Sequence, residues 1–234
     1  MTTTPPSARG LPLFRSAYGF SCRLLLLSLL ALFLIPPFLE TVGWSPGVAA
    51  VLFTATMFSA LLAVSDHRIG AASLLVLVPP LAMVWLQHFG LSPNNQVVGI
   101  GYLSYLIILE GFAVWRLLRF VLSAKEVDAE TLAAGVSIYL LLGLLWSSLY
   151  TMLSEVQVSP FKGELSHGVL SQADAFYFSL CTLTTAGYGD ISPVSHQARI
   201  LAVMESVTGV LYVGMLIARL VSLYSQGKPA PEKS

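Results

Sequence analysis

Charged residues are scarce in this sequence. Asp, Glu, Lys and Arg make up 10% of the 234 residues, whereas about 25% is usual for soluble proteins. Hydrophobic residues make up 56%, so a water-soluble globular protein is excluded. Twelve Lys and Arg balance twelve Asp and Glu, and the overall charge therefore gives no reason to expect a nucleic acid or an acidic partner.

Cysteine is almost absent. The chain has two, Cys22 and Cys181, which lie far apart, each inside an apolar stretch. This spacing fits neither a disulfide framework nor a zinc site, so we expect two buried thiols. The sequence also lacks a grouped nucleophile, base and orienting residue, a phosphate loop and a cofactor motif. We therefore expect no enzyme activity and no cofactor.

Long apolar runs are what the sequence has in quantity. A hydrocarbon core of about 30 Å needs roughly 20 mostly apolar residues per helix. Six runs qualify, at residues 22–40, 47–64, 69–88, 97–120, 131–153 and 198–224. The sequence therefore predicts an all-α integral membrane protein with six transmembrane helices. We interpret the pairs Pro36-Pro37 and Pro79-Pro80 as kinks within two of them.

The placement of basic residues predicts the orientation. Six helices put both termini on one side, and this leaves only Lys162 and Arg199 of the twelve Lys and Arg on the opposite side. Basic residues accumulate on the cytoplasmic side, so we expect a multi-pass protein of the cell membrane with both termini cytoplasmic.

One apolar segment, 173–184, is too short to cross a bilayer as a helix, since it has only about twelve residues. Ser171 and Asp174 at its start form the S-x-x-D pattern of a capping box, which predicts a half-helix that enters the membrane. Residues 184–190, Thr-Thr-Ala-Gly-Tyr-Gly-Asp, follow directly. Non-helical backbone at this depth is tolerated where it lines a water-filled path. Gly187 and Gly189 can adopt positive φ, so consecutive carbonyls can turn toward one axis.

The run Thr-Leu-Thr-Thr-Ala-Gly-Tyr-Gly-Asp resembles the potassium-channel signature T-x-T-T-V-G-Y-G-D. In that family four such loops line one pore, and their carbonyls replace the hydration shell of K⁺. The resemblance implies a homotetramer in the lipid bilayer with K⁺ as the permeant ion. The expected filter is Thr184, Thr185, Ala186, Gly187, Tyr188, Gly189 and Asp190. The carbonyls of Thr185, Ala186, Gly187 and Tyr188 would hold the ion, and Asp190 would lie at the outer mouth.

The resemblance continues into the last apolar run. Gly209 looks like the glycine hinge of potassium-channel inner helices, and Gly214 is a weaker hinge candidate. On this register Val210, Val213, Ile217 and Val221 would face the cavity and its cytoplasmic constriction. Residues 131–224 would be a pore domain, made of an outer helix 131–153, a pore helix 173–184, the filter 185–190 and an inner helix 198–224.

The pore region departs from the pattern at several positions. Ala186 replaces the usual Val or Ile, which predicts a looser filter. Phe178 stands where many relatives have Trp, and Tyr177 is a candidate to compensate. Cys181 lies behind the filter, where apolar packing is favoured over redox sensing. Glu205 would face the pore helix at Ser179 or Thr182, and functional and purely structural roles stay equally open.

Residues 22–120 resemble a degenerate voltage-sensor domain. The run from Val97 to Trp115 has no basic residue, and Arg116 and Arg119 come only at its cytoplasmic end. We therefore expect weak or absent voltage dependence. Residues 121–130 are expected to be an amphipathic connector at the inner membrane surface, residues 1–21 a disordered cytoplasmic N-terminus, and residues 225–234 a cytoplasmic tail without a ligand-binding domain.

The leading hypothesis is a K⁺-selective, passive channel. A weakly selective monovalent cation channel is the nearest alternative because of Ala186 and the missing Trp. A non-conducting membrane subunit or sensor, or a transporter, belongs to a different class, and the sequence shows no inverted repeats or paired broken helices that would support a transporter.

Overall fold

The computed structural model describes residues 13–39, 45–64, 71–91, 95–163, 165 and 170–226. Helices dominate these residues. They are α1 (Leu13–Leu39), α2 (Ser45–Val64), α3 (Ala71–His88), α4 (Gln96–Ser123), α5 (Ala129–Val156), α6 (Gln172–Leu183) and α7 (His196–Gln226), with strands β1 (Phe161–Gly163) and β2 (Ile191–Pro193).

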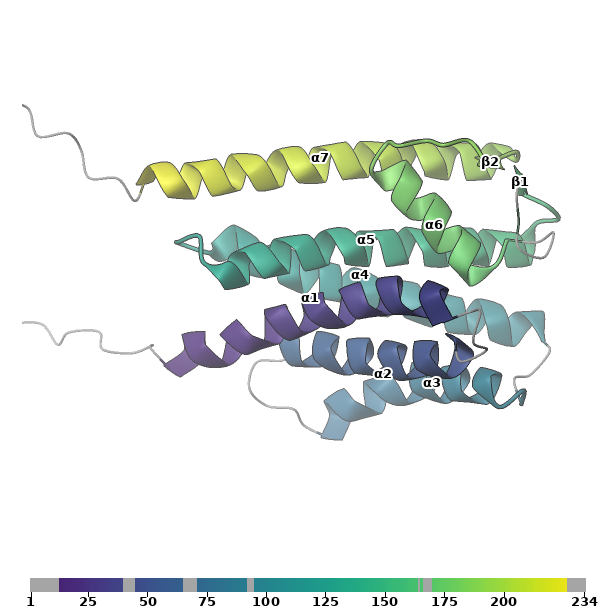
Figure 1. Ribbon diagram of the computed structural model, residues 1–234, viewed down its shortest axis with the longest axis horizontal. Coiled ribbons are helices and arrows are strands. Elements are labelled where there is room, and N and C mark those ends of the chain that lie inside the picture. Colours follow the sequence, from purple (N-terminus) through teal and green to yellow (C-terminus); the bar gives the residue numbers. More distant parts are fainter. Residues whose placement is uncertain are drawn as a thin grey trace, which may run out of the picture.

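Five helices are long and apolar enough to cross a bilayer, namely α1, α2, α4, α5 and α7, and a shorter apolar stretch, Leu75–His88, lies in α3. They run alongside one another in a bundle, whereas α6 crosses obliquely between α5 and α7 (Figure 1). The chain is thus an all-α, multi-pass membrane protein, as the hydropathy pattern predicts. Both proline pairs lie inside continuous helices, α1 and α3.

Two apolar clusters hold the bundle together. The larger cluster joins α1, α2, α4 and α5, with Leu25, Leu117, Ile138 and Leu141 almost completely buried. The smaller cluster lies around Tyr150 of α5, where α6 and the two strands meet α5. Buried side chains in such clusters make many weak dispersion contacts, which is the main source of packing energy inside a bilayer.

Two predicted boundaries are wrong. Residues 13–21, expected to be disordered, belong to α1, because no proline interrupts the chain there and the helix continues beyond the apolar run. The connector expected over 121–130 covers only 124–128, since α4 continues to Ser123. Residues 1–12 and 227–234, where other parts of the terminal predictions fall, lie outside the described residues.

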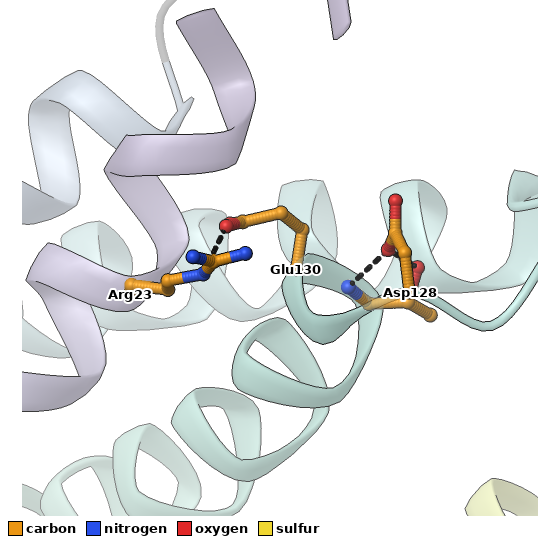
Figure 2. A network of polar contacts seen from close by, with 4 residues as sticks. Arg23, Asp128 and Glu130 are labelled. Carbon is orange, nitrogen blue, oxygen red and sulfur yellow. Dashed lines mark hydrogen bonds and ion pairs between the residues drawn. The ribbon is translucent and has the colours of Figure 1, made fainter. Parts of the chain in front are cut away.

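Capping and an ion pair fix the start of α5. The carboxylate of Asp128 accepts a hydrogen bond from the backbone N–H of Thr131 at 2.9 Å, so Asp128 is the N-cap. Arg23 of α1 reaches Glu130 in the first turn of α5, with 2.5 Å between Nε and Oε1 (Figure 2). A carboxylate in the first turn of a helix also interacts favourably with the positive, N-terminal end of the helix dipole. These contacts fix the point at which α5 begins and so limit the connector between α4 and α5 to residues 124–128.

The strand pair is a feature that sequence reasoning missed. β1 and β2 are antiparallel, with Lys162 opposite Ser192 and Gly163 opposite Ile191. Gly163 has a φ of 131°, and a Cβ there would lie 1.8 Å from the carbonyl oxygen of Asp190. Only glycine allows this approach, so the pair fixes the chain directly after the predicted filter.

Candidate functional site

The site begins with α6, whose N-terminus is capped as the sequence predicts. The Ser171 hydroxyl oxygen accepts from the Asp174 backbone N–H at 3.1 Å, and the Asp174 carboxylate accepts from the Ser171 backbone N–H at 3.3 Å. This is a complete capping box. The helix covers twelve residues and ends at Leu183. The chain then returns to the end of the bundle where α6 began (Figure 1).

The segment after α6 turns its backbone N–H groups toward that helix. Thr185 N–H donates to the Thr182 carbonyl at 3.0 Å, and the N–H groups of Ala186 and Gly187 both donate to the Cys181 carbonyl, at 2.8 and 3.3 Å. Gly187 and Gly189 have φ of 56° and 83°, and Thr185 shares this left-handed region at 59°. A non-glycine residue rarely adopts it, so hydrogen bonds must hold Thr185 there.

The carbonyl groups of the segment remain available. Among the described residues, no donor bonds to the backbone oxygens of Thr185, Ala186, Gly187 or Tyr188. The side chains from Thr184 to Tyr188 are exposed, and that of Tyr188 is 75% exposed. Four successive acceptors on an exposed, non-helical segment, with the N–H groups of Thr185, Ala186 and Gly187 bonded to α6, form a surface that can bind a cation once other carbonyls face it.

The far end of the segment is tied back to α6. The Tyr177 hydroxyl donates to the Asp190 carboxylate at 2.6 Å, and Ile191 N–H donates to the other carboxylate oxygen at 3.0 Å. The hydrogen bond from Tyr177 lowers the pKa of Asp190 from its usual value. Phe178 points the other way and packs edge-to-face against Tyr150 and Phe161. Tyr177 thus donates to Asp190, and whether this bond compensates for the missing Trp stays a prediction.

Cys181 contributes mainly through its backbone, because its carbonyl is the acceptor for the two N–H groups described above. The prediction of two buried thiols holds for Cys22 and is wrong for Cys181, whose side chain is only partly buried. Burial raises the pKa of the Cys181 thiol, which disfavours the reactive thiolate. The apolar packing role that the sequence favours for Cys181 stays a prediction.

The helix α7 supports α6 from behind. Glu205 Oε1 lies 2.6 Å from the hydroxyl oxygen of Ser179, which belongs to α6, the helix that Glu205 is predicted to face. The Ser206 hydroxyl donates to the Thr182 carbonyl at 3.3 Å. At Gly209 a Cβ would lie 2.1 Å from the Leu183 carbonyl oxygen, so the last turn of α6 rests directly on the α7 backbone. A close approach thus explains this glycine, whereas the open space around Gly214 imposes no such need.

Most of the α7 surface has no partner within the described chain. The predicted cavity residues Val210, Val213, Ile217 and Val221 are between 41% and 62% exposed. The opposite side of α7 carries Glu205 and Tyr212, both buried, and the Tyr212 hydroxyl donates to the Gly135 carbonyl of α5 at 2.6 Å. A continuous apolar surface of this size marks a contact with lipid or with another protein chain.

Sequence reasoning missed a contact between the end of α7 and the end of α4. The Arg219 guanidinium donates to the carbonyls of Leu122 and Ala124, at 2.8 and 2.6 Å. From the sequence, Arg219 was only one of the ten basic residues expected on the cytoplasmic side. Arg116 and Arg119 are also engaged locally: Arg116 donates to the Val64 carbonyl at 3.0 Å, and Arg119 lies 4.6 Å from the centre of the Trp115 ring.

A separate cavity of about 280 Å³ lies among α2, α3 and α4, lined mainly by apolar side chains. Buried Glu110 of α4 and Arg116 contribute its polar lining. One Glu110 oxygen accepts from the Ser148 hydroxyl of α5 at 3.1 Å. This cavity is remote in sequence from the segment 184–190 and does not include any residue of it.

The sequence is similar to those of several known proteins. A family model described as an ion channel matches residues 134–226. Two-pore potassium channel 4 of Arabidopsis thaliana is 32% identical over 101 residues, which cover 43% of this chain and 36% of that protein. The voltage-gated potassium channel Kch of Escherichia coli is 27% identical over 205 residues, 86% of this chain and 43% of that protein. The calcium-gated potassium channel TvoK of Thermoplasma volcanium is 41% identical over 46 residues, 20% of this chain and 13% of that protein. The chain thus spans less than half the length of these relatives, and no solved structure matches it.

Proposed function

We propose that this chain is a member of the pore-loop potassium channel superfamily and that it conducts K⁺ passively through a homotetrameric pore. The segment 184–190 would be its selectivity filter. The observation that carries the proposal is the arrangement of this segment: three N–H groups bonded to α6 on one side, and four unbonded carbonyls on an exposed, non-helical backbone. Such oxygens can replace the hydration shell of an alkali cation.

The tetramer is proposed because one chain supplies one such strand, which cannot surround an ion. The exposed apolar surface of α7 supports the same assembly, since four copies around an axis would cover part of it. In this arrangement Val210, Val213, Ile217 and Val221 would line the cavity and its cytoplasmic constriction. Because Gly209 lies against the Leu183 carbonyl, bending of α7 at Gly209 would have to break this contact. We propose that Gly209 is the hinge about which the C-terminal part of α7 moves.

We further propose that the channel responds weakly to voltage. Arg116 and Arg119 stand at one end of α4, and each is held by a local partner, the Val64 carbonyl and the Trp115 ring. Charges that stay at the edge of the membrane field contribute little gating energy. The cell membrane with both termini cytoplasmic is the location that fits the distribution of basic residues.

The test is K⁺ flux from liposomes that contain the purified protein. We expect flux that Ba²⁺ blocks and that Gly187→Ala abolishes, because an L-residue at a φ of 56° is strained. Gly101→Ala in α4 is the matched control. Neither glycine has an atom within 4 Å of its would-be Cβ, so the two variants differ mainly in the backbone conformation that they disturb. Flux that survives both Ba²⁺ and Gly187→Ala would remove the filter assignment.

The weakly selective cation channel is the alternative that Ala186 favours, since a side chain smaller than the usual Val or Ile makes fewer packing contacts and allows the filter more movement. Reversal potentials in mixed K⁺ and Na⁺ separate the two functions. A potential that follows the K⁺ gradient supports K⁺ selectivity, and one that follows both gradients supports the alternative. A purified protein that passes neither ion would be a non-conducting membrane subunit.

A further inference from the structure

Glu205 is an acid buried among three helices of the pore half. Its side chain is fully buried, with Oε1 lying 2.6 Å from the hydroxyl of Ser179 in α6 and Oε2 lying 2.5 Å from the hydroxyl of Tyr150 in α5. Among the described residues, no Lys, Arg or His forms an ion pair with it. The ionisable groups that interact with it are Tyr150 and Tyr139, both of α5.

The number of hydrogens in this cluster decides the state of the acid. The Ser179 hydroxyl oxygen also lies 2.8 Å from the carbonyl oxygen of Gly143, which gives three short oxygen–oxygen contacts in all. Each contact needs one hydrogen, and the hydroxyls of Ser179 and Tyr150 supply one each. An ionised Glu205 would therefore leave one pair of acceptor oxygens facing each other without a hydrogen between them.

A protonated Glu205 resolves all three contacts. Its own O–H donates to Ser179, the Ser179 O–H donates to the Gly143 carbonyl, and the Tyr150 O–H donates to the second oxygen of Glu205. Each hydroxyl then donates once, and each contact has its hydrogen. The neutral form also avoids the cost of holding an unpaired carboxylate away from water.

We infer that Glu205 is a neutral, hydrogen-donating carboxyl that positions α6 and, through α6, the segment 184–190. Its neighbours on α7 continue the same contact, with Ser206 on the Thr182 carbonyl and Gly209 against the Leu183 carbonyl. The bond to Ser179 thus fixes the helix about one turn before these contacts, and Tyr150 fixes Glu205 to α5. Glu205 is a positioning residue, and only its effect on ion selectivity rests on the proposed function.

Infrared spectroscopy of the purified full chain tests the protonation state. We expect the band of a protonated carboxyl at neutral pH that disappears in Glu205→Gln. Glu110→Gln is the matched control, because Glu110 is also a buried acid of the bundle, but the hydrogen bond to its side chain comes from Ser148 of α5 and not from α6 or α7. Loss of a carboxylate band in Glu205→Gln, instead of a protonated-carboxyl band, would overturn the inference. This readout needs no ion flux, so it stands even if the chain does not conduct K⁺.

A second comparison tests the positioning role. The amide of Glu205→Gln can donate to Ser179 and accept from Tyr150, so we expect K⁺-over-Na⁺ selectivity within about threefold of the unaltered protein. Glu205→Leu keeps a similar volume but removes both hydrogen bonds, and we expect selectivity to fall by about tenfold or more. Equal selectivity in the two variants would overturn the positioning role.

If Glu205→Gln does not assemble, Ser179→Ala replaces it in the infrared test. That variant removes the acceptor of the Glu205 O–H, so the protonated-carboxyl band should move to higher frequency. An unmoved band would show that Glu205 does not donate to Ser179 and would overturn the hydrogen count.

Discussion

The pore half (α5–α7 with the strands) and the four-helix half (α1–α4) differ in how closely their helices pack. In the pore half, Tyr139, Tyr212 and Ser206 each donate to a backbone carbonyl of a neighbouring helix, and Glu205 joins three helices. In the four-helix half, Thr56, Tyr105 and Arg116 likewise donate to backbone carbonyls of neighbouring helices, but a cavity of about 280 Å³ remains between the helices.

The difference concerns geometry. Directed hydrogen bonds and close backbone approaches fix the position and rotation of a helix, whereas apolar contacts in a bilayer tolerate some sliding, because lipid is as apolar as the side chains. A filter needs carbonyl oxygens held in place, and the pore half supplies directed contacts around it. The contacts between the helices of the four-helix half need not fix their positions as closely. The predictions below test this contrast, starting with the largest effect.

Gly209→Ala should be the most damaging of these changes. The added methyl would lie 2.1 Å from the Leu183 carbonyl oxygen, and a rigid backbone cannot give way as a flexible side chain can. We expect a loss of about 3 kcal/mol of stability, or failure to assemble, together with loss of flux. Thermal unfolding in detergent and the liposome assay measure both.

Gly214→Ala is the matched control on the same helix, because no atom lies within 4 Å of its would-be Cβ. It should be neutral or stabilising by up to about 1 kcal/mol, since alanine favours the helix. If the two variants were equally stable, the close contact between α7 and α6 would not exist as described.

Arg219→Ala tests the joint between the two halves. The guanidinium bonds two carbonyls at the end of α4, Leu122 and Ala124, and hydrogen bonds from a charged donor contribute about 1.5–3 kcal/mol each at most. We expect about 2 kcal/mol of lost stability and faster amide hydrogen exchange over residues 124–128. Arg219→Lys keeps the charge but loses the planar fork, and should fall in between. An exchange rate that does not change in Arg219→Ala would contradict the joint.

The sequence predicted the pore half in more detail than its joint with the rest. Period, length and turn chemistry are local, so the apolar runs, the capping box at Ser171 and the positive φ of Gly187 could be predicted. Glu205 could be placed against α6 because a buried acid needs a partner. The Arg219 contact could not be found, because it joins residues about a hundred positions apart and a cytoplasmic arginine already has an ordinary explanation. The strand pair was missed because three-residue strands carry no periodic signal.

Tyr177→Phe removes one directed contact at the outer end of the filter. The hydrogen bond from Tyr177 lowers the pKa of the Asp190 carboxyl in the folded protein. The stability that this bond contributes is therefore present above the pKa that Asp190 has in the unfolded chain, and it is lost as the pH falls through the pKa of Asp190 in the folded protein. Without the hydroxyl, the pKa of Asp190 should rise toward its usual value. We therefore expect flux to be lost at a higher pH during acidification than in the unaltered protein.

The control for this change is Tyr105→Phe in the four-helix half. Tyr105 also donates one hydrogen bond at 2.6 Å, but to the Val76 carbonyl, which does not titrate. Its flux should show the unaltered pH dependence. The same acid sensitivity in both variants would mean that the effect of Tyr177→Phe does not pass through Asp190.

Ala60→Leu, which fills the cavity of the four-helix half, should have the smallest effect and opposite sign. Ala60 is buried and lines the cavity, whereas Ala55 of the same helix is exposed, so Ala55→Leu is the matched control. The larger side chain gains dispersion contacts that the cavity lacks, and we expect about 1 kcal/mol of added thermal stability over the control. Because the filling lies away from α6, the K⁺-over-Na⁺ reversal potential should not change. A shifted reversal potential would show that the packing of the four-helix half affects the geometry of the filter.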